Sequence, residues 1–191
     1  NFNAEKLTVE AIRVEVTGKK LRVILVDDGQ LFTHSTLHLP EILDGNVISA
    51  TQNDVLKLVV YNRYHPSKPA VGFIKNIGLK RGAMASTVSH DSHNIVAVGA
   101  SDADIIKAIN ILIDNKGGIV ACDSQTTCLL ALPVAGLMSA ESGEVISEKY
   151  KQADAHRLAF GLGRCTRKTS PRIGRCNIRS LDPAADAGRR R

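Results

Sequence analysis

The chain has 191 residues, of which 43% are hydrophobic and 23% charged, an ordinary composition for a globular protein with a real core. No run approaches the ~20 apolar residues of a membrane helix, which excludes an integral helical membrane protein. The net charge of +6 is uneven, because residues 157–191 hold ten Lys or Arg and two Asp, whereas residues 1–156 hold 15 basic and 17 acidic residues. A mildly acidic body argues against nucleic acid as its partner.

In chain order, the first half predicts strands joined by turns. Alternating apolar and polar residues over 11–16, a turn at 17–20 and a second apolar run over 21–26 predict a hairpin. Further strands are expected over 31–39 and 54–61. Two prolines make residues 65–69 a loop.

The second half adds helices to the strands. Strands are expected over 83–88, 95–98, 119–122 and 128–132. Between the second and third of these, Ser101 and Asp104 have capping-box spacing. A helix follows, with Gly117 suited to the left-handed position beyond its end. Its expected inward face is Ile105, Ile106, Ile109, Leu112 and Ile113. A last helix over 139–154 is expected to turn Val145, Ile146 and Tyr150 inward.

These elements predict an α+β domain over residues 1–155. The sheet is expected to be mixed and rich in antiparallel pairs, with a strand–helix–strand unit and helices packed on one side. Residues 156–191 lack apolar periodicity and predict a basic tail that is disordered, or that is a shifted-frame or foreign extension rather than native sequence. The functional alternative for this tail is an arm that binds nucleic acid.

Four cysteines without a CxxC pair predict free thiols and a cytoplasmic protein. The H-x-E and P-C-x-x-C signature of zinc nucleobase deaminases is absent from the sequence. Glycines 72, 78 and 82 lie among Lys75, Lys80 and Arg81, but no phosphate-loop pattern surrounds them, so turns are expected there.

The densest polar stretch, residues 86–94, lies immediately before an apolar strand and contains the candidate site. Buried polar groups need partners, so the stretch predicts a hydrogen-bonded turn, a substrate pocket or a domain interface. A metal site would need a third ligand from Asp91, His65 or His34, at no recognised spacing, and no metal ligand or catalytic residue is assigned. The candidates are His90, Asp91, Ser92, His93 and Asn94.

Six stretches over residues 1–150 carry a resemblance to one family. They are residues 1–4, 27–31, 72–83, 86–94, 117–120 and 132–139, in the family's order and spacing. The chain resembles the C-terminal domain of bacterial adenine deaminases, members of the amidohydrolase superfamily. The resemblance implies a metal-dependent hydrolase of purine salvage that converts adenine and water to hypoxanthine and ammonia.

The resemblance also implies which part of the longer protein holds the metal. The manganese or iron ligands of such enzymes belong to an N-terminal (β/α)8 barrel, so this chain is expected to bind no cofactor itself. A chain that opens on Asn in a polar segment predicts a fragment, inactive alone, whose partners are the barrel, adenine and further copies in a homo-oligomer. Residues 90–94 would then shape the pocket or lock the domain interface. The alternative is a non-enzymatic module that binds purines or nucleic acid.

Overall fold

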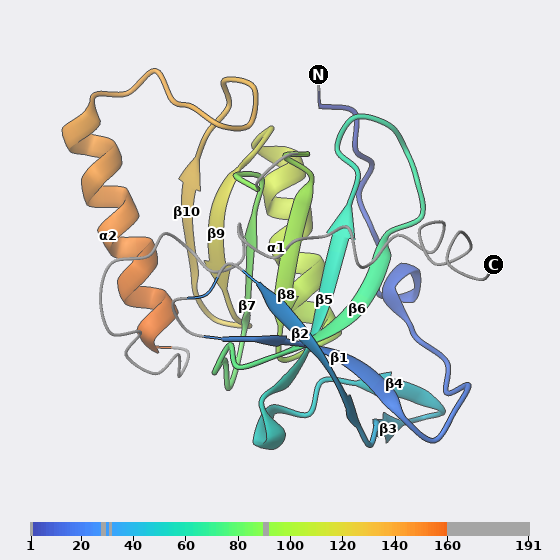
Figure 1. Cartoon of the computed structure of the whole chain (residues 1–191). Coiled ribbons are helices and arrows are strands. Elements are labelled where there is room, and N and C mark those ends of the chain that lie inside the picture. Colours follow the sequence, from blue (N-terminus) through green and yellow to red (C-terminus); the bar gives the residue numbers. More distant parts are fainter. Residues whose placement is uncertain (1, 28–29, 31, 90–91, 160–191) are drawn as a thin grey trace.

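The computed structural model describes residues 2–27, 30, 32–89 and 92–159. Its centre is an eight-stranded sheet in the order β10-β9-β7-β8-β5-β6-β1-β2 (Figure 1). Every neighbouring pair is antiparallel except β1 with β6. The mixed, antiparallel-rich α+β fold is therefore confirmed. The strands are β1 (Leu21–Val26), β2 (Thr33–His38), β5 (Val55–Tyr61), β6 (Ala70–Lys75), β7 (Ala83–Ser86), β8 (Ile95–Gly99), β9 (Gly118–Cys122) and β10 (Thr127–Ala131).

Smaller elements and two α-helices surround this sheet. β3 (Glu41–Leu43) and β4 (Asn46–Ile48) form a separate hairpin, and η1 (Val9–Ile12) and η2 (Thr51–Asn53) are short 3-10 turns. α1 (Asp102–Asp114) packs against β7, β8 and β9, and α2 (Gly143–Ala159) packs against β10 and β9 at the border of the sheet (Figure 1). No described helix is both long enough and apolar enough to cross a membrane.

The strand–helix–strand unit is β8–α1–β9, with β7 inserted between its two strands. β7 pairs antiparallel with β8 on one side and with β9 on the other, so β8 and β9 run parallel. Every side chain of β5 is buried, and most of them contribute to two apolar clusters on opposite faces of the sheet. The cluster that includes Val59 and Tyr61 lies under α1, and the cluster that includes Leu56, Leu58 and Val60 lies on the opposite face.

The start of α1 confirms Ser101 as the N-cap, and its hydroxyl, rather than its backbone N–H, bonds to the Asp104 carboxylate. The Asp104 backbone N–H donates to Ser101 Oγ at 3.2 Å, and the Ser101 hydroxyl donates to Asp104 Oδ2 at 2.8 Å. Behind this cap, the predicted inward face is buried throughout, from Ile105 to Ile113. The sequence alone is sufficient to predict this helix, because both its N-cap and its apolar stripe are local features of one helix.

We expect Ser101→Ala to lower the free energy of unfolding by about 1 kcal/mol, since the substitution leaves an N-terminal amide of α1 without its acceptor. Urea denaturation monitored by circular dichroism measures this loss. Ser67→Ala, at an exposed loop serine, is the control and should change stability by less than about 0.5 kcal/mol. Equal values for the two variants would contradict the assigned cap.

The end of α1 differs from the prediction by one residue. Lys116 occupies the left-handed position, with φ of 55°. The Lys116 N–H donates to the Ile113 carbonyl at 3.2 Å, and the Gly117 N–H donates to the Leu112 carbonyl at 2.8 Å. This is a Schellman ending, in which Gly117 is the second residue past the cap.

The hairpin predicted over residues 11–26 is wrong. Residues 9–12 form η1, and the chain from Arg13 to Val16 runs beside the β3–β4 hairpin without forming a strand of its own. The Val47 N–H donates to the Val14 carbonyl at 2.8 Å. β1 instead pairs with β2 and β6, which lie later in the sequence. The alternation of apolar and polar residues over 11–16 therefore does not mark a strand. Of these six residues, only Ile12 is buried.

The inward face predicted for α2 is wrong at two of its three residues. Val145 and Tyr150 are exposed, whereas Ile146 is half-buried and Ala153 is buried. The helix continues to Ala159, beyond the predicted boundary at residue 155. The predicted tail from residue 160 onward lies outside the described residues.

An N-terminal arm, residues 2–16, lies along the α1 side of the sheet. The Leu7 N–H donates to Asn110 Oδ1 at 2.9 Å, and Asn110 Nδ2 donates back to the Leu7 carbonyl at 3.0 Å. The Tyr61 hydroxyl donates to the Glu5 carbonyl at 3.2 Å. These bonds connect the arm to α1 and to the central strand β5, so the arm is part of the folded unit.

Candidate functional site

The candidate motif lies at one end of the sheet, which we call the rim. The rim consists of residues 62–64, 87–89, 92–94, 116–118 and 133–138, where β5, β7 and β10 end and β8 and β9 begin. Figure 1 shows this end at the top of the view, beside the N-terminus. The antiparallel order of the strands therefore brings loops that are far apart in the sequence to the same place.

Ser92, His93 and Asn94 follow β7 in the connection to β8 and are all half-buried. The Ser92 carbonyl accepts a hydrogen bond from the Tyr64 hydroxyl at 3.1 Å, and the His93 N–H donates to the Ser89 carbonyl at 3.3 Å. His93 has φ of 51°, a left-handed conformation that histidine adopts infrequently. His90 and Asp91, the other two predicted members, lie outside the described residues.

Four buried polar atoms at the rim have no hydrogen-bond partner among the residues that the structure describes. They are Arg63 Nε, Ser89 Oγ, His93 Nδ1 and Asn94 Oδ1. Ser89 is only 2% exposed and Arg63 only 4%. A buried donor or acceptor without a partner costs about 1–3 kcal/mol. Because three of the four atoms come from one strand connection, the cost is concentrated at the predicted motif.

Arg63 is a rim residue that sequence reasoning missed. Its Nη1 donates to the Ala135 carbonyl at 2.6 Å, and its Nη2 donates to the Tyr64 hydroxyl at 3.0 Å. Its guanidinium lies 4.8 Å from the Tyr64 ring centre and 5.7 Å from that of Phe2. The one signal for it in the sequence is weak, an arginine shortly after a strongly apolar strand. Arg63 thus joins the N-terminal arm, the β5–β6 connection and residues 133–138.

Thr87 makes the second connection across the rim. Its buried hydroxyl donates to the Gly136 carbonyl at 2.6 Å and accepts from the Gly118 N–H at 2.9 Å. Gly117 lies in close backbone contact with Gly136, at a position where a side chain would overlap the Gly136 Cα. The Thr87 hydroxyl therefore links residues 116–118 to residues 133–138. These two segments can approach each other closely because Gly117 and Gly136 have no side chains.

The described residues do not fit a metal centre, because no three His, Cys, Asp or Glu side chains among them lie close enough to hold an ion. Neither of the two histidines considered as further ligands belongs to such a group. His34 is on β2, where its Nε2 is 3.2 Å from Asp27, and exposed His65 follows the end of β5. We therefore derive no chemical step through a metal at the described residues.

The turns expected among the glycines and basic residues between 72 and 82 are found at Gly78 and Gly82, whereas Gly72 and Lys75 lie within β6. The Gly78 N–H donates to Asp54 Oδ1 at 2.6 Å, and Lys80 Nζ donates to the Thr51 carbonyl at 2.8 Å. Gly78 and Gly82 both have positive φ. These bonds explain this stretch as local structure.

The cysteines in the described residues are free thiols, as predicted. Burial raises the pKa of the Cys122 thiol to about 11 and also raises that of Cys128. A thiol with so high a pKa is protonated at neutral pH and is a poor nucleophile. Cys165 and Cys176 lie outside the described residues.

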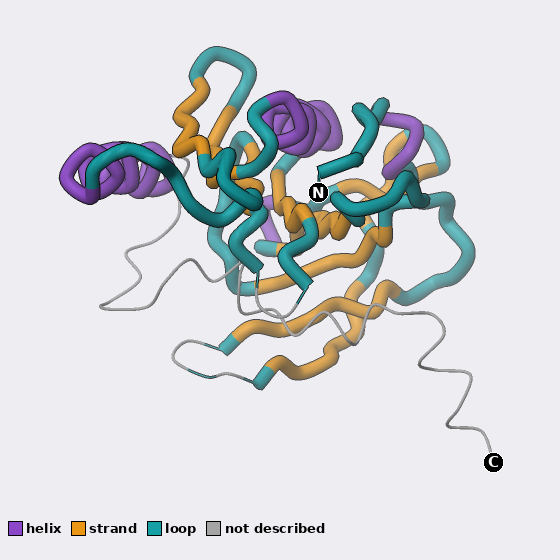
Figure 2. Tube along the Cα trace, turned by 90° about the horizontal axis from the view of Figure 1, so that it is seen from above, coloured by secondary structure: helices purple, strands orange, loops and turns teal. Residues whose placement is uncertain are grey.

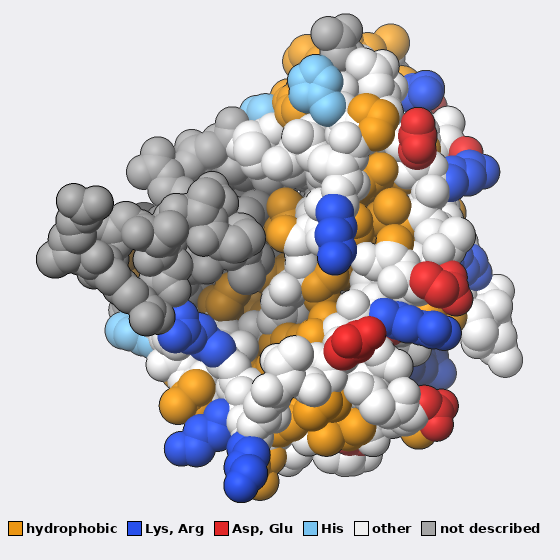
Figure 3. Space-filling view, turned by 90° about the vertical axis from the view of Figure 1, so that its right-hand side faces the viewer, with side chains coloured by type: hydrophobic (Ala, Val, Ile, Leu, Met, Phe, Trp, Pro, Cys, Tyr) orange, Lys and Arg blue, Asp and Glu red, His pale blue; other side chains and the backbone are white. Residues whose placement is uncertain are grey.

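The molecule also has a hollow of about 1240 Å³ between the N-terminal arm, residues 44–46 and residues 66–69. Its lining includes Glu5, Glu10, Glu15 and Asp44 together with Lys6, Arg13 and Lys68, so charges of both signs alternate there. Figure 3 shows the side of the molecule on the right of Figure 1, with acidic and basic side chains interspersed. None of the four rim residues with unpartnered atoms lines this hollow.

Together, the fold and the rim define a class of protein: an α+β domain whose buried, incompletely paired polar groups gather at one end of a mixed sheet. The family model of the adenine deaminase C-terminal domain matches residues 30–168. The chain belongs to the adenine deaminase C-terminal domain family.

Individual relatives agree with this assignment. The chain is 47% identical over 155 residues to an adenine deaminase of Parabacteroides distasonis, covering 81% of this chain and 28% of the relative. It is 43% identical over 168 residues to one of Methanosarcina barkeri, covering 84% and 30%, and 40% identical over 151 residues to one of Borreliella burgdorferi, covering 78% and 28%. The chain thus spans less than a third of the length of these relatives.

Proposed function

We propose that this chain serves as the C-terminal domain of an adenine deaminase, a hydrolase of cytoplasmic purine salvage that converts adenine and water to hypoxanthine and ammonia. The observation that carries the proposal is the family match over residues 30–168, together with relatives named adenine deaminase at 40–47% identity. Because this chain matches less than a third of each of those relatives, the reaction's chemistry is assigned to the part of them that this chain does not match.

In this proposal, the described residues hold no manganese or iron and perform no step of the hydrolysis. The metal would be held by the barrel that precedes this domain in the longer enzyme. The domain's own contribution is to position loops and to exclude water, tasks for which rigid, buried loop ends are suited.

The rim is the surface that we assign to the barrel. The arm reaches the rim at its first described residues, since the Asn3 N–H donates to the Arg63 carbonyl at 2.7 Å and Phe2 stacks on Arg63. A polypeptide preceding these residues would therefore leave the domain beside Ser92, His93 and Asn94. Ser89 Oγ and Asn94 Oδ1 are buried and have no partner among the described residues, and in this proposal docking of the barrel rearranges the connection so that both atoms gain one. A role of His90 and Asp91 in this interface or in a pocket wall stays a prediction from the sequence, because both lie outside the described residues.

A chimera tests this function directly. We expect adenine-dependent ammonia release when this chain replaces the matching segment of the Parabacteroides distasonis relative, and none from the relative truncated at that segment. The isolated 191-residue chain, supplied with Mn(II) or Fe(II), should release ammonia no faster than a blank. In the chimera, Asn94→Ala should reduce kcat/KM by about tenfold or more, the effect of losing one buried hydrogen-bonding group of about 1.4 kcal/mol.

Three outcomes would contradict the proposal. Turnover by the isolated chain would show that the chemistry is not confined to the barrel. A folded but inactive chimera would argue against the deaminase role itself. Tight adenine binding by the isolated chain in calorimetry would favour the alternative, a purine-binding module without enzymatic activity.

A further inference from the structure

The peptide group between Ser92 and His93 is hydrogen-bonded at both ends. Its C=O accepts from the Tyr64 hydroxyl at 3.1 Å, and its N–H donates to the Ser89 carbonyl at 3.3 Å. The orientation of this peptide sets the φ of His93, which at 51° lies in the left-handed region that a histidine rarely occupies. Such a conformation persists only where neighbouring groups hold it. The two hydrogen bonds identify groups that do so.

Tyr64 is itself fixed at three points. Its N–H donates to Asn62 Oδ1 at 2.8 Å, and its carbonyl accepts from Asn3 Nδ2 at 3.2 Å. Its hydroxyl accepts from Arg63 Nη2 at 3.0 Å. A guanidinium can only donate hydrogen bonds, so the single hydrogen of the Tyr64 hydroxyl is left for the Ser92 carbonyl. Arg63 thus sets the direction of the bond that reaches the candidate motif.

We propose that Tyr64 is a positioning residue for the deamination, an inference that rests on the proposed function. Its hydroxyl, directed by Arg63, holds the peptide ahead of His93 and thereby keeps His93 and Asn94 in the arrangement that the reaction needs. His93 Nδ1 and Asn94 Oδ1 are buried and have no partner among the described residues, so these two side-chain atoms contribute no hydrogen bond that would hold the connection in place. Tyr64 supplies a restraint from outside the connection and acts through these residues, not as a catalytic group.

Tyr64 also links the motif to the N-terminal arm. Asn3, which bonds to the Tyr64 carbonyl, belongs to the arm, and the ring of Phe2 lies 5.7 Å from the Arg63 guanidinium. Figure 2, which looks down on the rim, shows the start of the arm among the loops at this end of the sheet. A displacement of the arm would therefore reach Tyr64 and, through its hydroxyl, the Ser92 carbonyl.

Hydrogen exchange on the full 191-residue chain, followed by nuclear magnetic resonance, tests the restraint without any measurement of activity. Tyr64→Phe keeps the ring and removes the hydroxyl, which frees the Ser92–His93 peptide to rotate. The His93 amide, whose bond to Ser89 depends on that orientation, should then exchange about fivefold faster.

Tyr61→Phe is the matched control for this experiment. It removes a hydroxyl at the same end of the sheet that also donates to a backbone carbonyl, that of Glu5, at 3.2 Å. Exchange of the His93 amide should stay within about twofold of the unmodified chain. A His93 amide that exchanges at the same rate in the two variants would overturn the proposal.

The chimera with the Parabacteroides distasonis relative tests the link to the reaction. Tyr64→Phe should lower its kcat/KM about fivefold, and Tyr61→Phe should leave it within about twofold. Adding Tyr64→Phe to Asn94→Ala should cost less than about a further twofold, because both changes act on the same connection. Independent effects, including a mere loss of folded enzyme, would multiply to about fiftyfold or more. Multiplied effects would overturn the inference.

The outcomes separate this inference from the proposed function. A folded chimera without activity would remove the deaminase role and, with it, the role of Tyr64 in the reaction. An active chimera in which Tyr64→Phe matches the unmodified sequence would remove the inference alone.

Discussion

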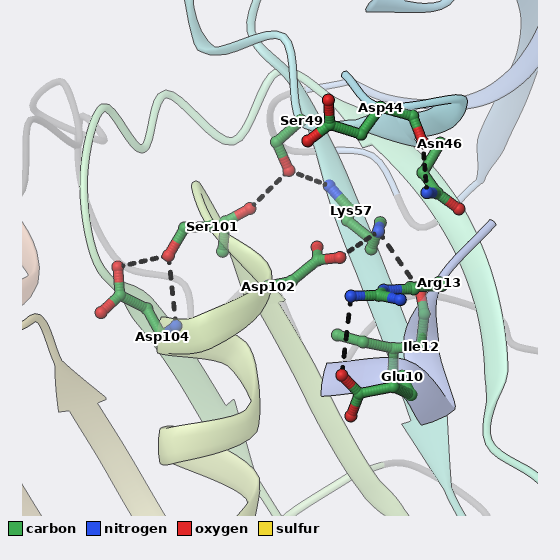
Figure 4. A network of polar contacts seen from close by, with 11 residues as sticks. Glu10, Ile12, Arg13, Asp44, Asn46, Ser49, Lys57, Ser101, Asp102 and Asp104 are labelled. Carbon is green, nitrogen blue, oxygen red and sulfur yellow. Dashed lines mark hydrogen bonds and ion pairs between the residues drawn. The ribbon is translucent and has the colours of Figure 1, made fainter. Parts of the chain in front are cut away.

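Asp102→Ala is expected to lower the free energy of unfolding by about 3–5 kcal/mol, the cost of leaving a buried charge without its partner. Lys57 is fully buried in the middle of β5, and its Nζ lies 2.7 Å from Asp102 Oδ2. Its other acceptor is the Ile12 carbonyl in the arm, at 3.2 Å. Figure 4 shows how the first turn of α1 and the arm converge on this ammonium group. Urea denaturation of the purified variant measures the loss.

The matched variant is Lys57→Met, which removes the other charge of the same pair. Asp102 keeps contact with water, at 19% side-chain exposure, and stands at the N-terminal end of α1, where negative charge is favourable. Lys57→Met should therefore cost only about 1–2 kcal/mol. If Lys57→Met proved the more destabilising of the two, the ammonium group would not depend on Asp102 as the geometry indicates.

Gly117→Ala is expected to destabilise the protein by about 2–4 kcal/mol, because two independent effects act at this position. Gly117 has φ of 119°, which side chains of L-residues rarely permit. A Cβ there would overlap the Gly136 backbone and lie 3.0 Å from Thr87 Oγ1. Relief would require moving residues 133–138 away from Thr87, which would break the hydroxyl's bond to Gly136. Thermal or urea unfolding measures the change in stability.

Gly18→Ala is the control for this substitution. A Cβ added at Gly18 would meet no heavy atom within 4 Å, and Gly18 has no positive φ, so the change should stay within about 0.5 kcal/mol. A nuclear magnetic resonance spectrum of Gly117→Ala should show shifts concentrated at residues 87, 118 and 136. Shifts confined to α1 would mean that the close contact between Gly117 and Gly136 does not exist.

The parts of the fold that the sequence predicts correctly depend on local signals. The Ser101 cap and the buried stripe of α1 both lie within one element, and β5 is apolar at almost every position. The errors arise where distant segments decide the outcome. Residues 11–16 alternate like a strand, but their neighbours are residues 45–47, and β1 finds its partners at β2 and β6.

The same division holds for the candidate site. The density of polar residues is enough to select Ser92, His93 and Asn94, which the structure places at the rim. Arg63 could not be found in this way, because its partners are the Ala135 carbonyl and a ring at Phe2, far away in sequence. Ala153 was likewise missed as an inward residue of α2, since a single small side chain contributes little periodic signal.

The arm has a consequence for where this domain can be cut. The match to the family model begins at residue 30, yet Asn110, Tyr61 and Lys57 each bond to a carbonyl between residues 5 and 12. A shortened chain starting at residue 30 would lose β1. It would also lose the carbonyl groups that accept hydrogen bonds from the Asn110 amide, the Tyr61 hydroxyl and the Lys57 ammonium. The start of the family match and the start of the stably folded unit are therefore different, and an expressed fragment should include the arm.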